Sequence, residues 1–185
     1  MSNNLVINKR SFDVSLYEMD LDYINQDVEK YLHEIQMSEE ESVLTTYYTN
    51  DNIILDSKLI FFKDFIFSHV YLFCKNVLNK DKFELKNSWF QTYKKENYHT
   101  IHVHNCTENS YSLIFYVKAS ENSSNTRFYL PGFPYTPAKM IDVQAKQNRL
   151  VIFPGYLPHQ VPPNKDEERI IFSANFESDR DWETR

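Results

Sequence analysis

Hydrophobic and polar positions follow different patterns in the two halves of the chain. Between Leu21 and Gln36, apolar residues recur every three or four positions, which is the spacing of one face of an α-helix. Asp20 or Asp22 stands where an N-terminal cap is expected. The pattern therefore predicts an amphipathic helix whose buried stripe consists of Leu21, Ile24, Val28, Leu32 and Ile35.

A second helix is predicted over about Ser57 to Asn79. This segment is apolar on most of its sides, so we expect the helix to be well buried. Its large side chains are interpreted as core residues, because Phe, Ile, Leu and Val are the types most often found inside proteins. The residues concerned are Leu59, Ile60, Phe62, Phe65, Ile66, Val70, Phe73 and Val77.

The second half of the chain is a series of short segments rich in β-branched and aromatic residues. Turn residues such as Pro131–Gly132, Pro154–Gly155 and Pro162–Pro163 separate them. This arrangement is typical of a sandwich, barrel or jelly roll, with the helices packed on one outer face of a sheet. The predicted strands are Ser88–Tyr93, Thr100–His104, Tyr111–Val117, Thr126–Tyr129, Lys139–Val143, Arg149–Phe153 and Ile170–Phe176.

Histidines stand out within this β-rich half. Side chains alternate between the two faces of a strand, so His102 and His104 share one face, and His99 falls on the opposite face if the strand is regular. His159 follows an apolar strand and a Pro-bounded turn. Neutral imidazoles suit Fe, Zn, Cu and Ni, and three protein ligands with open positions characterise catalytic metal sites. A His-x-His pair alone is more often structural.

Length and composition favour one globular domain of 185 residues, with mainly helical support over about 1–85 and a β core over about 86–178. A hydrophobic content of 42% with 16% aromatic residues excludes disorder. Only 2 glycines are present, which excludes Gly-rich phosphate-binding loops.

The net charge of −6 is spread along the chain without a basic run, so no nucleic acid partner is expected. The N-terminus lacks a signal-peptide apolar region, and no apolar run reaches membrane-spanning length. We therefore expect no membrane partner and a cytoplasmic location. The abundance of Asn, Lys, Ile and Tyr suggests an AT-rich coding source such as a virus, whose product would lie in the host cytoplasm.

From Gln91 to Phe176 the sequence resembles the Fe(II)- and 2-oxoglutarate-dependent oxygenases, most of all small ones of phages and marine bacteria, and more distantly the prolyl hydroxylases. The segments that carry the resemblance are His102-Val-His104, Ser112–Lys118, Leu150–Val161 and Arg169–Asn175. The resemblance implies a double-stranded β-helix and a metal bound by His102, His104 and His159. His104 occupies the position at which the family has Asp or Glu, and Glu108 is an alternative ligand.

The resemblance also implies a site for the co-substrate. Arg169, ten residues after His159, matches the cation that binds the distal carboxylate. Tyr93 and Tyr116 match hydroxyls that hydrogen-bond this carboxylate, and Ser173 shares the strand face of Arg169. The alternative for Arg169 is a solvated end to the acidic run Asp166–Glu168.

The sequence thus predicts a dioxygenase that uses Fe(II), 2-oxoglutarate and O2, with ascorbate as a further candidate cofactor. Its substrate would be a small molecule or a protein side chain such as proline, and a homodimer is left open. Two alternatives remain: a cupin-like three-His metalloenzyme that does not use 2-oxoglutarate, and a non-catalytic binding module stabilised by a metal.

Overall fold

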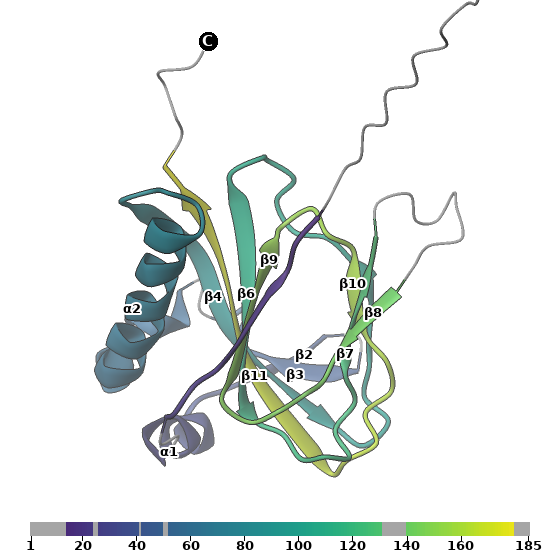
Figure 1. Cartoon of the computed structure of the whole chain (residues 1–185). Helices are drawn as coiled ribbons and strands as arrows, with labels where there is room; N and C mark the ends of the chain where they lie inside the picture. Colours follow the sequence, from purple (N-terminus) through teal and green to yellow (C-terminus); the bar gives the residue numbers. More distant parts are fainter. Residues whose placement is uncertain (1–13, 24–25, 41, 50–51, 131–139, 180–185) are drawn as a thin grey trace, which may run out of the picture.

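The computed structural model describes residues 14–23, 26–40, 42–49, 52–130 and 140–179. Within these residues the strands form two antiparallel sheets, and the helices lie on one side of the larger sheet (Figure 1). The helical elements are α1 (Gln26–Glu34), the short 3₁₀ turns η1 (Ile53–Leu55) and η2 (Ser57–Leu59), and α2 (Ile60–Asn76).

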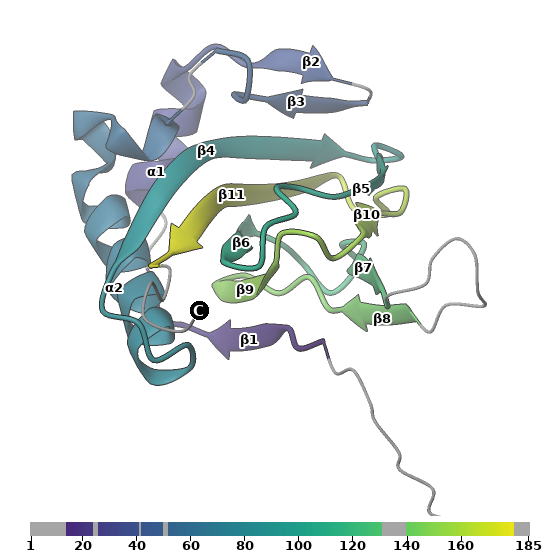
Figure 2. The same ribbon diagram turned by 90° about the horizontal axis from the view of Figure 1, so that it is seen from above.

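The larger sheet has seven strands and the smaller has four. In spatial order, the larger contains β1 (Tyr17–Asp20), β9 (Arg149–Pro154), β6 (Ser110–Lys118), β11 (Glu168–Ser178), β4 (Phe83–Lys94), β3 (Val43–Thr45) and β2 (Ser38–Glu40). The smaller contains β5 (His99–His102), β10 (His159–Val161), β7 (Thr126–Tyr129) and β8 (Met140–Val143). Seen from above, the smaller sheet faces the side of the larger sheet away from the helices (Figure 2). This is the expected double-stranded β-helix with helices on one outer face.

Alternation along β4, β6 and β11 separates the two sides of the larger sheet. One set of side chains packs on the helices around the buried ring of Phe62, which lies 6.0 Å from Phe90, 5.7 Å from Phe115 and 5.1 Å from Phe172, measured between ring centroids. The other set points between the sheets and forms a second cluster that includes Ile171. The inner side is where the predicted site residues lie.

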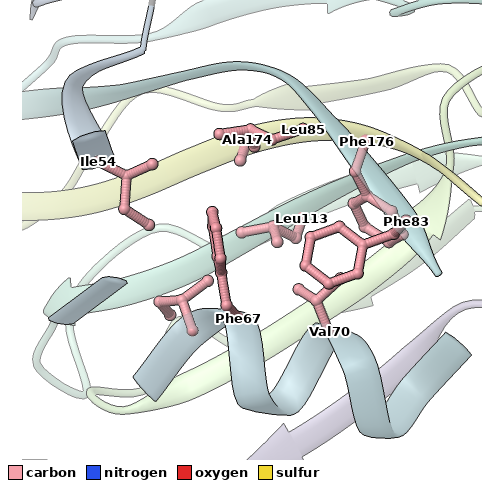
Figure 3. A pocket seen from close by; sticks show the side chains of 9 residues that line it. Ile54, Phe67, Val70, Phe83, Leu85, Leu113, Ala174 and Phe176 are labelled. Carbon is pink, nitrogen blue, oxygen red and sulfur yellow. The ribbon is translucent and has the colours of Figure 1, made fainter. Parts of the chain in front are cut away.

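Helix α2 is buried on one face only. Phe62, Ile66 and Val70 are buried, whereas Phe61 is 77% exposed and Leu72 is 50% exposed. Figure 3 shows Phe67 and Val70 pointing from α2 toward Leu113 and Phe176 of the sheet, around a narrow apolar gap. The prediction of a helix was confirmed, but the expectation that it is well buried was wrong for its outer face, because only one layer covers the sheet.

The first predicted helix is shorter than expected. It begins at Gln26 rather than Leu21, because Tyr17–Asp20 forms the edge strand β1 alongside β9, and the Leu21 N–H donates to the Asn148 carbonyl. Asp20 is not a helix cap, since its carboxylate pairs with Arg149 and Lys146. Ile24 lies outside the described residues.

The predicted strands are present, with shifted ends. β4, β6, β9 and β11 are longer than predicted, and β5 ends at His102 instead of His104. The sequence pattern did not predict the short strands β1, β2, β3 and β10, which have only three or four residues each. No helix in the described part of the chain is long and apolar enough to cross a membrane.

Candidate metal centre

Three histidines converge between the sheets. One ring nitrogen from each of His102, His104 and His159 lies within 4.8 Å of the others. His102 and His159 are direct partners across β5 and β10, which places their side chains on the same face. His104 reaches the group from the segment that follows β5. Strand alternation predicted the pair His102 and His104, and the family resemblance added His159.

Backbone carbonyls orient two of the imidazoles. Nδ1 of His102 lies 2.8 Å from the Thr100 carbonyl oxygen, and Nδ1 of His159 lies 2.9 Å from the Leu157 carbonyl oxygen. A carbonyl only accepts hydrogen bonds, so each Nδ1 carries the proton and each Nε2 keeps its lone pair. These two hydrogen bonds to backbone carbonyls therefore prepare both side chains to bind a metal through Nε2.

His104 is positioned through its backbone. Its N–H donates to the carbonyl of Gly155 at 2.8 Å, and the Gly155 N–H donates to the Ser110 carbonyl at 2.9 Å. A Cβ at position 155 would lie 2.5 Å from the carbonyl oxygen of Asn105, closer than real Cβ contacts. Gly155 is thus required for the close approach that holds the segment carrying His104.

Burial keeps the histidines neutral. Desolvation, followed by the proximity of His102 and His99, lowers the pKa of His104 to about 3. Desolvation also lowers the pKa of His159 well below its usual value, helped by His102 and His104. A neutral imidazole is the form that binds a metal, so these two side chains need not lose a proton near pH 7.

A fourth histidine lies beside the group. The ring of His99 stacks on that of His102 with centroids 4.1 Å apart, and its Nδ1 lies 3.5 Å from Tyr93 Oη. His99 was expected on the opposite face only if the strand were regular, and the strand is not regular here. The register of β5 against β10 shifts between His159 and Val161, and this irregularity brings His99 to the same side as His102. Glu108, the alternative ligand, is exposed and does not belong to the three-histidine group.

Arg169 lies deep inside the same space. It is fully buried, so the alternative of a solvated arginine was wrong. Its guanidinium carbon lies 4.8 Å from the centre of the Tyr93 ring and 5.1 Å from that of Tyr116. Nη2 donates to Thr126 Oγ1 at 2.9 Å, and Thr126 Oγ1 lies 2.7 Å from Tyr116 Oη. Two aromatic rings and a hydroxyl thus frame the cation.

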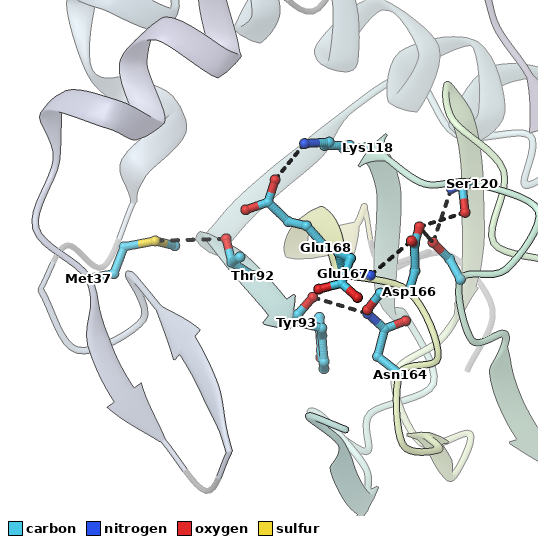
Figure 4. A network of polar contacts seen from close by, with 10 residues as sticks. Met37, Thr92, Tyr93, Lys118, Ser120, Asn164, Asp166, Glu167 and Glu168 are labelled. Carbon is cyan, nitrogen blue, oxygen red and sulfur yellow. Dashed lines mark hydrogen bonds and ion pairs between the residues drawn. The ribbon is translucent and has the colours of Figure 1, made fainter. Parts of the chain in front are cut away.

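The rest of the Arg169 guanidinium has no partner. Nε and Nη1 are buried, and neither finds a hydrogen-bond acceptor among the described residues. The neighbouring acids point elsewhere, since Glu168 pairs with Lys118 and Asp166 accepts from Ser120 (Figure 4). A buried charge with unpaired donors is costly, which makes this guanidinium a candidate anion site.

Two further predicted residues face the same interior. Burial raises the pKa of Tyr93, although Arg169 opposes the shift, so its phenol is protonated near pH 7. Ser173 is buried and lies two residues after Ile171 on β11. Its neighbours on the adjacent strands are Trp89 of β4 and Ile114 of β6. The sequence reading missed Thr126 and Trp89. Nothing in the sequence distinguishes Thr126, because its role follows only from its position opposite Arg169.

Known proteins share both the sequence pattern and the fold. Residues 87–175 match the family described as "Putative 2OG-Fe(II) oxygenase". HygX from Streptomyces hygroscopicus, solved with nickel and 2-oxoglutarate, has a TM-score of 0.66 at 11% identity, over 89% of this chain and 83% of that one. A further structure of HygX also holds hygromycin B.

Two hydroxylases are similar to the same extent. The viral collagen prolyl hydroxylase from Paramecium Bursaria Chlorella virus-1, in its 2OG complex, has a TM-score of 0.62 at 15% identity, over 89% of this chain and 96% of that one. A prolyl hydroxylase from Trichoplax adhaerens, in complex with a peptide of hypoxia inducible factor, has a TM-score of 0.63 at 12% identity. The match covers 88% of this chain and 83% of that one. No curated protein matches the sequence.

The two facing sheets define a double-stranded β-helix protein with a candidate metal centre between the sheets. Residues 87–175, a little under half of the chain, match the 2OG-Fe(II) oxygenase family, and the solved structures named above share the fold of the whole chain.

Proposed function

We propose that this protein is a dioxygenase in which His102, His104 and His159 hold Fe(II) and Arg169 binds the distal carboxylate of 2-oxoglutarate. The observation that carries the proposal is the buried Arg169 guanidinium, whose Nε and Nη1 lack partners, in the same interior as the three histidines. A dicarboxylate would bind the metal at one end of this space and pair with the guanidinium at the other.

A line of contacts connects the two ends. Arg169 packs on Tyr93, Tyr93 Oη lies 3.5 Å from His99 Nδ1, and the His99 ring stacks on His102. An elongated ligand lying along these side chains would meet the guanidinium at one end and the imidazoles at the other. We propose that Thr126, Tyr93 and Tyr116 orient the guanidinium, and that Ser173 lines the space.

When bound, Fe(II) with 2-oxoglutarate and O2 supplies the oxidation of a C–H bond. The protein supplies neutral nitrogen ligands, a fixed cation and a dry interior. The three imidazoles add no negative charge, so the centre is one unit more positive than one with a carboxylate ligand. This positive charge favours binding of the dianionic co-substrate.

The primary substrate is proposed to be a small molecule or a peptidyl side chain. The likeness to prolyl hydroxylases, one of them solved with a peptide, favours a peptidyl residue such as proline.

Anaerobic titration of the protein with Fe(II) and 2-oxoglutarate tests the proposal. We expect the visible charge-transfer band of a chelated keto acid, and we expect Arg169→Ala to raise the 2-oxoglutarate concentration needed for it without weakening metal binding. Arg127→Ala is the matched control, because Arg127 lies on β7 and pairs with Asp142 at the surface. A band that is absent, or that Arg169→Ala leaves unchanged, would refute the assignment.

His104 in place of an acid favours a second candidate, a three-histidine metalloenzyme that does not use 2-oxoglutarate. Formation of succinate from 2-oxoglutarate distinguishes the two. Stoichiometric iron on the three histidines with no succinate, in the presence of peptide and small-molecule substrates, would support the second candidate.

A further inference from the structure

A row of aromatic side chains runs from the candidate metal centre to the surface. The ring centroid of Trp89 lies 5.7 Å from that of His104 on one side and 5.1 Å from that of Tyr47 on the other. The ring of Tyr47 lies 5.2 Å from the ring of Tyr48. Each ring therefore contacts the next without a gap.

Exposure increases along this row. Trp89 is 5% exposed, Tyr47 is 39% exposed and Tyr48 is 64% exposed. The row begins beside a candidate metal ligand in the interior and ends in solvent. Packing alone does not account for the outer end, because an exposed tyrosine pair contributes little to a hydrophobic core.

The outer end of the row has a proton acceptor. Tyr48 Oη donates a hydrogen bond to Glu40 Oε1 at 2.6 Å. Tryptophan and tyrosine are the aromatic side chains that give up an electron most readily, and an oxidised tyrosine loses its phenolic proton at once. The carboxylate of Glu40 is placed to accept that proton.

We propose that Trp89, Tyr47 and Tyr48 form an electron relay that carries oxidising equivalents from the candidate metal centre to the surface, with Glu40 as the proton acceptor. In each transfer Trp89 gives one electron to the oxidised centre. Tyr47 then re-reduces Trp89 and releases its phenolic proton to solvent, and Tyr48 re-reduces Tyr47, which takes a proton back from solvent. The phenolic proton of Tyr48 passes to Glu40. The net change is one electron and one proton lost from Tyr48.

A reductant of the ascorbate class completes the cycle by returning one electron and one proton to Tyr48. A surface hollow of about 430 Å³ gives such a molecule access to the end of the relay. It is lined by Tyr47, Tyr48, Asn52, Lys86 and Asn87.

The use of the relay rests on the proposed function. A metal held by the three histidines could be oxidised while no primary substrate is present, and the relay would then supply it with electrons, each accompanied by a proton from solvent. The relay would thereby protect the ligands, His104 first, from oxidation. The relay itself is a property of the side chains and can be tested without metal.

Flash photoionisation of Trp89 in the metal-free protein tests the relay. The chain has a second tryptophan, Trp182, so the experiment uses the Trp182→Phe background, in which all tryptophan radical arises at position 89. We expect the transient absorption of the tryptophan radical to convert to that of a tyrosyl radical. Tyr47→Phe keeps the ring but cannot be oxidised by tryptophan radical, so most of this conversion should be lost.

Three further variants sharpen the test. Tyr48→Phe should leave the radical on Tyr47, and Glu40→Gln should slow formation of the Tyr48 radical, because the amide keeps a hydrogen bond but does not accept the proton. Tyr71→Phe, on the outer face of α2, is the matched control and should change nothing. Conversion that survives Tyr47→Phe, or that falls equally in Tyr71→Phe, would overturn the relay. Circular dichroism verifies that each variant is folded.

A second arm uses the protein loaded with Fe(II) and 2-oxoglutarate and exposed to O2 without primary substrate. Electron paramagnetic resonance should detect a tyrosyl radical that is quenched by ascorbate, that moves to Tyr47 in Tyr48→Phe and that is lost in Tyr47→Phe. Failure to bind metal or to consume 2-oxoglutarate would refute the proposed function and leave the flash result standing. Consumption of 2-oxoglutarate with no radical, even after rapid freezing, would overturn the protective role.

Discussion

Thr126 shows how one small side chain organises the anion end of the site. Its hydroxyl lies between Nη2 of Arg169 and the phenol of Tyr116, so it fixes the direction in which the guanidinium points. The residue is fully buried. Its contribution should therefore be visible in ligand binding.

Thr126→Val should weaken 2-oxoglutarate binding by roughly tenfold, the effect of about 1.5 kcal/mol expected when a hydrogen bond to a charged group is lost. Metal affinity should not change, because Thr126 does not belong to the histidine group. Calorimetric titration of each ligand measures the two effects. Thr126→Ser restores the hydroxyl and should recover most of the affinity, and equal loss in both variants would argue against the role.

The depressed pKa values of the histidines predict a pH dependence for the metal-free protein. His104 has a pKa of about 3 in the folded state, against 6.5 ordinarily, and that of His159 is also lowered. At a pH between about 3 and 6.5, the unfolded chain binds more protons than the folded chain. The free energy of unfolding therefore falls as the pH falls from about 6.5 toward 3. Thermal melts should show Tm decreasing in this window.

His104→Asn removes one of the two titrating groups and should make this decrease shallower. His33→Asn is the control, because His33 is exposed on α1. A wild-type Tm that stays constant from pH 6.5 to 4 would contradict the interpretation, since both folded-state pKa values would then be near normal.

Individual site residues were predictable to different degrees. Strand alternation pairs His102 with His104, and the resemblance adds His159 and Arg169. The position of His99 was not predictable, because it depends on a shift in register between β5 and β10 that no sequence pattern marks. Burial of Arg169 was favoured, because it begins an apolar strand, although an arginine after three acidic residues also fits a surface.

At the scale of elements, the turn that contains Gly155 determines where His104 lies. In Gly155→Ala we expect a larger loss in the free energy of metal binding than in the free energy of unfolding. The added Cβ would lie 2.5 Å from the Asn105 carbonyl oxygen, so the backbone at Asn105 must move. Metal titration and thermal melts on the same protein separate the two effects. Tyr156→Phe, at the next and exposed position, should leave both unchanged.

Long elements were predictable and short ones were not. β4, β6, β9 and β11 have strong apolar alternation or apolar runs, whereas β1, β2 and β3 are strands only because a neighbouring edge offers hydrogen-bond partners. β1 also shows why the first helix starts late. Pairing with β9 keeps the chain extended to Asp20, and this tertiary contact overrides the helical spacing of the sequence.

At the scale of the whole molecule, the helices and the candidate site occupy opposite sides of one sheet. Phe62→Ala should destabilise the fold by about 3–5 kcal/mol, because a fully buried ring is lost from the centre of the helix side. Phe61→Ala, at the adjacent position that is 77% exposed, should change stability by less than about 0.5 kcal/mol. Chemical denaturation measures both. Metal affinity of the folded Phe62 variant should match wild type, and a large loss would show that the two sides are coupled.

Some whole-molecule expectations stay predictions. These predictions are that residues 1–185 form one domain, that a homodimer can form and that ascorbate takes part. The strand pattern predicted a sandwich, barrel or jelly roll, because many short strands with turn residues between them have few ways to bury their apolar faces, and the family resemblance specified the double-stranded β-helix.

The alternation of β11 has an evolutionary consequence. Arg169, Ile171 and Ser173 face the site, while Ile170, Phe172 and Ala174 face the helices. Inserting or deleting one residue near the start of the strand would exchange the two sets, placing phenylalanine in the site and arginine under α2. Descendants of this gene can therefore vary these side chains one at a time, but selection should remove insertions and deletions within the strand. The ten-residue interval from His159 to Arg169 can change in length only in the turn that precedes the strand.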